Sequence, residues 1–189
     1  MQHRPKLLYG AALLLLLASA LHAQAPYFEA PRNAVPPDAR FPELLSDGER
    51  LILLYQEVSG AVEERELTVV GRFSTDGGLF SEPVEIAGPL SARTETAPLV
   101  YTAAVGADGY LYVALVTSPR TTEIYRGRPE NREFSRVSTI ETEVTNVAPR
   151  IYATRAGSLL LFVNQNVGAT QAILYSRSED GENWGDLRR

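Results

Sequence analysis

The feature that most constrains the fold is a short motif that occurs twice, 104 residues apart. Both copies read Ser-x-Asp-Gly-x-x-aromatic, and their key residues are Ser74, Asp76, Gly77 and Phe80, then Ser178, Asp180, Gly181 and Trp184. An Asp side chain accepts hydrogen bonds from backbone N–H groups two or three residues on, and Gly adopts positive φ without strain. Each copy follows a β-prone run, so the motif predicts a tight turn between two strands.

Landmarks around these turns repeat about every 50 residues. The aromatic residues after the turns are spaced 54 and 50 residues apart: Phe80, Phe134 and Trp184. The prolines that open each unit are spaced 56 and 51 residues apart: Pro42, Pro98 and Pro149. The middle unit keeps the turn at Gly127–Asn131 and its aromatic residue, but it lacks the Ser-x-Asp-Gly signature.

Each unit contains four predicted β-strands and almost no helical pattern. The predicted strands are 41–45, 50–58, 67–73 and 80–87; 97–101, 110–116, 122–126 and 134–140; and 148–152, 159–164 and 172–176, with a fourth strand barely begun in the last unit. A repeat of this length and content predicts an all-β fold, a β-propeller of four-stranded blades. About three blades are expected, at 40–90, 95–142 and 146–189, the last incomplete; a β-sandwich with unrelated turns is the alternative.

The N-terminal residues have the pattern of a secretory signal peptide. Arg4 and Lys6 precede an apolar run from Leu7 to Leu21, and small residues follow. We expect a signal peptide at 1–23, cleaved after Ala23, and a Pro-rich extended lead-in at 24–39. An uncleaved anchor is the alternative, although the apolar run is short for a membrane span. The mature protein is therefore expected to be exported (periplasmic, secreted or cell-surface) with no membrane span.

Composition excludes several kinds of chemistry. The chain has no Cys, and its two histidines, His3 and His22, both lie in the predicted leader. Thiolate and imidazole groups are thus missing from the mature chain, and we predict no cofactor and no metal site. The net charge is −5, and loss of the leader's Arg4 and Lys6 leaves the mature chain more acidic, which argues against nucleic acid as a partner.

The two turns resemble the Asp-box, or BNR repeat, of sialidase-like propellers, whose usual form is Ser/Thr-x-Asp-x-Gly-x-x-Trp. Residues 74–81 and 178–184 match it with one residue fewer before the aromatic. In that family the box lies between the third and fourth strands of a blade and organises the turn. The resemblance covers residues 40–189 and implies structural roles for Asp76 and Asp180; metal binding or catalysis is the alternative.

A second resemblance concerns Arg40. Sialidases carry Arg-Ile-Pro on the first strand of the first blade, and its Arg belongs to a triad that binds the substrate carboxylate. Arg40-Phe41-Pro42 stands at the matching place, and a guanidinium suits a carboxylate because two parallel charge-assisted hydrogen bonds form. The resemblance implies that Arg40 binds substrate. The alternative is that Pro42 is a repeat feature, shared with Pro98 and Pro149, and that Arg40 is a solvated neighbour.

A complete catalytic set is not evident, so the sequence leaves enzyme activity undecided. The family's acid/base Asp belongs between Arg40 and the first box, where Asp47 sits in a predicted hairpin turn. The glutamates in that interval are Glu57, Glu63, Glu64 and Glu66. The tyrosines of the repeat are expected to be half-buried strand residues rather than nucleophiles: Tyr55, Tyr101, Tyr112, Tyr125, Tyr152 and Tyr175.

Closed propellers have four or more blades. We therefore expect the missing blades to come from the rest of a longer chain, with an oligomer that completes the ring as the alternative. The favoured function is an exported ligand-binding, scaffold or sensor module with a carbohydrate or protein ligand. The alternative is the N-terminal part of an exo-sialidase or a related glycoside hydrolase.

Overall fold

The computed structural model describes residues 35–61, 65–91, 101–143, 148–167 and 170–189. The chain divides into two units, Met1–Asn33 and Ala34–Arg189, and all described residues belong to the second. The predicted signal peptide, most of the lead-in and Pro98 lie outside the described residues. Within the described residues, no helix is long and apolar enough to cross a membrane.

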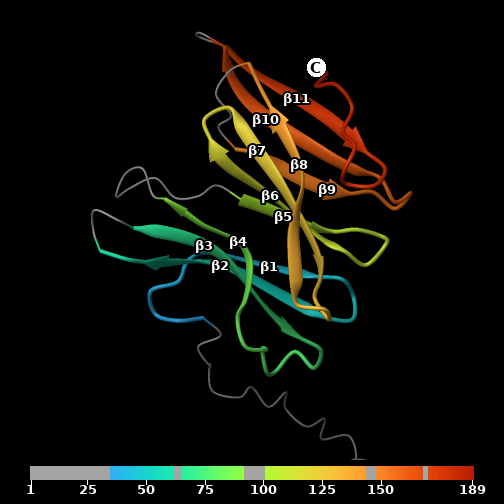
Figure 1. The fold of residues 1–189 in the computed structure, drawn as a ribbon. Coiled ribbons are helices and arrows are strands. Elements are labelled where there is room, and N and C mark those ends of the chain that lie inside the picture. The colour runs from blue at the N-terminus through green and yellow to red at the C-terminus, as the bar shows by residue number, and fades with distance from the viewer. Residues whose placement is uncertain (1–34, 62–64, 92–100, 144–147, 168–169) are drawn as a thin grey trace, which may run out of the picture. The chain divides into compact units, whose positions relative to one another are not determined.

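In the part of the chain that the structure describes, eleven strands form three antiparallel sheets in which sequence neighbours pair (Figure 1). The first sheet contains β1 (Arg40–Ser46), β2 (Leu51–Ser59), β3 (Glu66–Ser74) and β4 (Val84–Ser91). The second sheet contains β5 (Tyr101–Val105), β6 (Leu111–Ser118), β7 (Thr121–Arg128) and β8 (Glu133–Glu141). The third sheet contains β9 (Arg150–Ala153), β10 (Leu159–Val167) and β11 (Thr170–Ser178). The predicted propeller-type, all-β fold is confirmed for the described residues.

The predicted start of β4 was wrong. Residues from Phe80 were expected to enter the strand, but β4 begins at Val84. Ser81 N–H still donates to the Phe73 carbonyl, yet Pro83 has no N–H with which to continue the ladder. The chain therefore remains in the turn for four more residues, Phe80 to Pro83.

Two apolar cores lie between the sheets. The first contains Ile52, Leu54 and Val69 of the first sheet with Leu111 and Val113 of the second. Such side chains alternate along each strand, so each buried strand presents one apolar row to each neighbouring sheet. The first strand of each sheet is its inner strand. These inner strands, β1, β5 and β9, lie next to one another in that order, because β5 contacts both β1 and β9.

A second core joins the second and third sheets and includes Tyr112, Ile124, Leu159 and Leu161. The aromatic residue after each turn packs into the core on the N-terminal side of its own sheet. Phe134 stacks on Phe73 of the first sheet, with ring centroids 6.3 Å apart and an interplanar angle of 8°. Trp184 packs against the core between the second and third sheets.

The third sheet has three full strands, and two isolated bridges mark the place of a fourth. After β11, Trp184 pairs with Ser178 and Arg188 pairs with Tyr175, both antiparallel. Tyr175 and Arg188 exchange backbone hydrogen bonds of 2.7 and 2.9 Å. This confirms the expectation that the last predicted blade is incomplete in this sequence.

Candidate functional site

The Ser74 turn (Ser74–Phe80) and the Ser178 turn (Ser178–Trp184) share one hydrogen-bond pattern. Ser74 Oγ donates to Asp76 Oδ1, which also accepts the backbone N–H groups of Gly78 and Leu79 at 2.8 and 3.0 Å. Gly77 N–H donates to Ser74 Oγ, and Gly77 has a φ of +72°. The sequence pattern alone accounts for this geometry because all the donors are local.

In the Ser178 turn, Asp180 Oδ1 accepts the Ser178 hydroxyl and the N–H groups of Glu182 and Asn183. Asn183 also donates its side-chain amide to Asp180 Oδ2 at 2.7 Å. These donors stabilise the charged form and lower the pKa of Asp180 below its usual range. Backbone N–H groups of Leu79 and Gly78 likewise lower the pKa of Asp76 to about 2.

Both carboxylates are thus occupied by their own turns. Among the described residues, no group of three or more His, Cys, Asp or Glu side chains could hold a metal ion. The turns are better suited to fixing the chain path than to binding a ligand, which directs attention to the two ends of the inner strands β1, β5 and β9.

At their N-terminal ends, the inner strands carry Arg40, Tyr101 and Arg150. The pairing of β1 with β2 shifts register between Arg40 and Glu43, which marks a β-bulge. Phe41 lies in the bulge with a φ of +51°, and its carbonyl accepts a hydrogen bond from the Tyr101 hydroxyl. Bulges redirect side chains and are frequent beside functional sites. The bulge therefore sets the direction in which exposed Arg40 leaves the strand.

Glu43 and Arg150 form the second part of this end. Glu43 follows the bulge and is half-buried; burial raises its pKa, while a backbone hydrogen bond from Ala103 and the charge of Arg150 oppose the increase. Arg150 is exposed and donates to the carbonyl of Pro149 at 3.1 Å. The sequence did not identify Glu43 and Arg150 as a pair. Their side chains come close to each other only because β1, β5 and β9 are the inner strands of the three sheets.

The acid candidates named from sequence lie elsewhere. Glu57 lies in β2, paired with Thr68 of β3, and Glu66 is exposed at the start of β3. Asp47 belongs to the β1–β2 turn, as predicted, and Glu63 and Glu64 are outside the described residues. Glu43 is thus the carboxyl group that the fold places beside the start of the inner strands.

Four tyrosines of the repeat have a raised pKa. Burial raises the pKa of Tyr101 and of Tyr112, and it raises the pKa of Tyr125 and of Tyr55 to about 12, so each phenol stays protonated near neutral pH. The expectation of half-burial fits Tyr125, whereas Tyr55, Tyr101 and Tyr112 are buried and Tyr152 and Tyr175 are exposed. They are 53% and 37% exposed, on the face of the third sheet that is turned away from the second.

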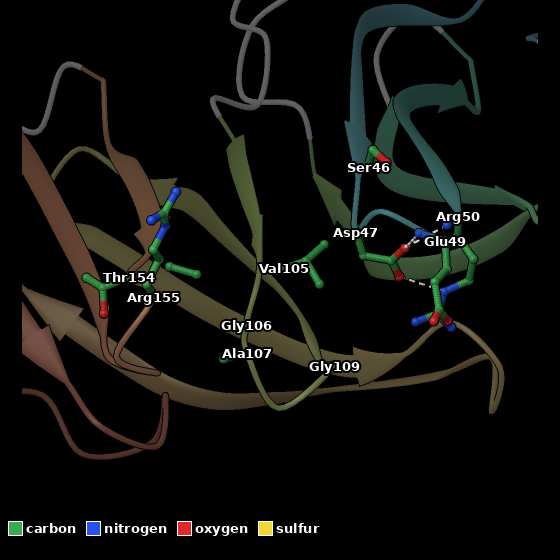
Figure 2. A pocket seen from close by; sticks show the side chains of 11 residues that line it. Ser46, Asp47, Glu49, Arg50, Val105, Gly106, Ala107, Gly109, Thr154 and Arg155 are labelled. Atoms are coloured by element: carbon green, nitrogen blue, oxygen red, sulfur yellow. Dashed lines mark hydrogen bonds and ion pairs between the residues drawn. The ribbon is translucent and has the colours of Figure 1, made fainter.

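At the opposite end of the inner strands, three turns border a pocket of about 570 Å³. Figure 2 shows its charged residues: Asp47 and Arg50 bond across the β1–β2 turn, and Arg155 comes from the β9–β10 turn. Arg50 contacts Asp47 Oδ2 at 2.7 Å and Glu130 Oε2 at 2.5 Å. Burial acts to raise the pKa of Asp47. The hydrogen bonds from the N–H groups of Glu49 and Arg50 and the Arg50 guanidinium lower it by more, so the pKa is below its usual value.

The two ends differ in the charged groups that they offer to a ligand. In the pocket, the Arg50 guanidinium is shared between two carboxylates, which leaves exposed Arg155 as the one further guanidinium among the residues lining it. At the other end, Arg40 and Arg150 form no ion pair within 4.0 Å with another described residue. The N-terminal ends of β1, β5 and β9, with Arg40, Glu43 and Arg150, are therefore the candidate site.

Comparison with known proteins yields structural matches only. No family model and no curated protein sequence matches the chain. A Hadza microbial sialidase superposes with a TM-score of 0.52 at 15% identity, covering 80% of this chain and 38% of that one. A glycosyl hydrolase from Bacteroides ovatus gives a TM-score of 0.47 at 12% identity, covering 80% and 51%. The α-L-arabinanase of Cellvibrio cellulosa gives 0.41 at 11%, covering 75% and 53%.

The superposition on the sialidase shows the fold of the described sheets. The described sheets have the architecture of part of a sialidase-type β-propeller, and the chain spans well under two thirds of the length of each match.

Proposed function

We propose that this chain belongs to an exported carbohydrate-binding propeller whose ligand is an acidic sugar. The ligand carboxylate would bind Arg40 and Arg150 at the N-terminal ends of β1 and β9. The observation that carries the proposal is the pair of exposed guanidinium groups without ion pairs among the described residues, held on inner strands beside Glu43.

Physical chemistry supports a carboxylate at this site. A guanidinium offers N–H donors in a planar fork that fits the two oxygens of a carboxylate. The bulge at Phe41 and its hydrogen bond from Tyr101 fix the start of β1, so Arg40 is presented from an ordered backbone. A fold shared with a protein named as a sialidase, whose substrates carry a carboxylate on the sugar, agrees with this choice.

Hydrolysis of a glycoside is the second candidate function. Burial raises the pKa of Glu43, which favours the protonated carboxyl that a general acid needs to protonate a leaving-group oxygen. In this version, Arg40 would bind the substrate carboxylate and Glu43 would donate the proton. A scaffold or sensor role would need the same binding site but no proton donor.

Binding measurements test the proposal. The exported chain should bind N-acetylneuraminic acid in calorimetry, and its mature form should begin at Gln24 by mass spectrometry. Arg40→Ala and Arg150→Ala should each weaken binding about tenfold or more, because each removes a charge-assisted contact worth about 1.5–3 kcal/mol.

Arg120→Ala is the matched control. Arg120 is exposed in the β6–β7 turn and forms no ion pair within 4.0 Å with another described residue, so its loss should leave binding unchanged. Unchanged binding by Arg40→Ala and Arg150→Ala would refute the site. Hydrolysis of a fluorogenic sialoside that is lost in Glu43→Gln, with binding retained, would select the enzyme over the binding module.

A further inference from the structure

The bulge in β1 brings two charged side chains to one face of the first sheet. Side chains alternate along a regular strand, so Arg40 and Glu43, three residues apart, would lie on opposite faces. The register shift changes this, because Arg40 pairs with Gln56 and Glu43 pairs with Leu54. Gln56 and Leu54 are two residues apart in β2 and share a face, and residues paired directly across two strands point to the same side. Arg40 and Glu43 therefore lie on the same face.

This face is turned toward the second sheet. Leu54 belongs to the first core, and so do Tyr101 and Ala103 of β5. Glu43 lies half-buried at the edge of that core and accepts a hydrogen bond from the Ala103 backbone N–H. A carboxyl group beside apolar side chains loses part of its hydration, which disfavours its charged form. Burial accordingly raises the pKa of Glu43.

The charged and titratable groups around Glu43 come from the three inner strands, since β2 places an apolar residue opposite it. On β9, the positive charge of Arg150 acts on the Glu43 carboxyl group. On β5, the Tyr101 hydroxyl donates to the Phe41 carbonyl, and burial raises the pKa of this phenol, so it stays neutral. On β1, Arg40 shares the face of Glu43. Neither arginine forms an ion pair within 4.0 Å with another residue of the described ranges.

A ligand carboxylate bound by Arg40 and Arg150 would meet Glu43 as a second carboxyl group. Two carboxylates that share a site repel each other, and one of them then takes up a proton more readily. Glu43 is the group on which the proton is held, because its burial already disfavours the charged form. Neutral Glu43 leaves the charge of both guanidinium groups to the ligand.

We propose that Glu43 couples the binding of an acidic sugar to the uptake of one proton. The site binds the ligand tightly when the Glu43 carboxyl group is neutral, whereas charged Glu43 competes with the ligand carboxylate for the guanidinium groups. Binding therefore strengthens as the pH falls, until Glu43 is protonated in the free protein as well. The inference rests on the proposed function and adds a pH-dependent regulation of the same site.

Calorimetry of the exported chain tests the proton uptake directly. Binding of N-acetylneuraminic acid is measured near neutral pH in two buffers that differ in their enthalpy of ionisation, and the difference in heat counts the protons taken up. The acid should bind with net proton uptake, and its uncharged carboxamide should bind with none. Between about pH 7.5 and 5, where a sugar carboxylate stays ionised, affinity for the acid should rise by up to about tenfold per pH unit, while affinity for the carboxamide stays level.

Glu43→Gln imitates the neutral carboxyl group, since its amide oxygen can still accept the hydrogen bond from Ala103. This variant should bind the acid without proton uptake and with the same affinity from about pH 5 to 7.5. Glu133→Gln is the matched control. Glu133 is exposed at the start of β8 and forms no ion pair within 4.0 Å in the part of the chain that the structure describes. Its replacement should leave the proton uptake unchanged.

The possible outcomes separate this inference from the proposed function. Binding of the acid that requires Arg40 and Arg150 but takes up no proton would overturn the coupling and leave the carboxylate site standing. Proton uptake that persists in Glu43→Gln would assign the proton to another group and overturn the role of Glu43. Absence of binding by the unchanged chain at every pH from about 5 to 7.5 would overturn both proposals.

Discussion

The contact between the Ser178 turn and the second sheet makes a sharp prediction about glycine. Gly181 has a φ of +77°, and a Cβ added there would lie 2.2 Å from Tyr112 Cε1. The Tyr112 ring is 1% exposed, and its hydroxyl donates to Asp108 Oδ2 at 2.7 Å, so the ring has little freedom to move. Gly181→Ala should therefore suffer both backbone strain and a steric clash.

Gly77 in the Ser74 turn separates these two costs. It has nearly the same backbone, with a φ of +72°, but the nearest atom to an added Cβ is Leu51 Cδ1 at 3.9 Å. An alanine in the left-handed region costs about 1–2 kcal/mol at either site. Overpacking adds about 1–3 kcal/mol at Gly181 alone. The free energy of unfolding should therefore fall more in Gly181→Ala than in Gly77→Ala, by about that second amount.

Urea unfolding measures this difference. Far-UV circular dichroism follows the sheets, and fluorescence of Trp184, the sole Trp in the chain, reports on the turn itself. Tyr112→Leu combined with Gly181→Ala should recover much of the loss, because the substitution removes the ring that meets the new Cβ. Equal losses in Gly77→Ala and Gly181→Ala would refute the packing of the Ser178 turn on Tyr112.

Two further predictions concern the turns and the core. Phe134→Ala should lower the free energy of unfolding by about 2–4 kcal/mol in urea titrations, because it removes the ring stacked on Phe73; a loss below about 1 kcal/mol would contradict that packing. The pKa of Asp76 is lowered from 3.8 to about 2, so its carboxylate stabilises the fold above about pH 4, and this contribution is lost as pH falls towards 2. Acid titrations should therefore show a flatter fall in stability between pH 4 and 2 for Asp76→Asn than for the unchanged chain, and parallel curves would count against the hydrogen bonds of the Ser74 turn.

The sheets could be predicted from sequence because their signals are local. Runs such as Leu51–Ser59 and Leu111–Ser118 alternate apolar side chains, and Asp-Gly pairs mark the turns between strands. The regular spacing of Phe80, Phe134 and Trp184 then gave the repeat. The error at β4 came from Pro83, whose missing N–H delays the ladder despite a β-prone sequence.

The candidate site could be predicted only in part. Arg40 was found through its motif. Glu43 and Arg150 lie on strands that are separated in the sequence by all four strands of the second sheet. Their approach follows from β5 lying next to both β1 and β9, which is a property of the assembled sheets. The exposure of Tyr152 and Tyr175 was missed for a similar reason, since a strand pattern does not tell which face a neighbouring sheet covers.

The most direct test of the central claim changes the ligand and leaves the protein untouched. Calorimetry should compare N-acetylneuraminic acid with its carboxamide, which keeps the ring and its hydroxyl groups but lacks the charge. If Arg40 and Arg150 bind the carboxylate, the carboxamide should bind about tenfold or more weakly, and added salt should reduce the difference. Equal affinity for the two ligands, or no binding of the acid, would contradict the account.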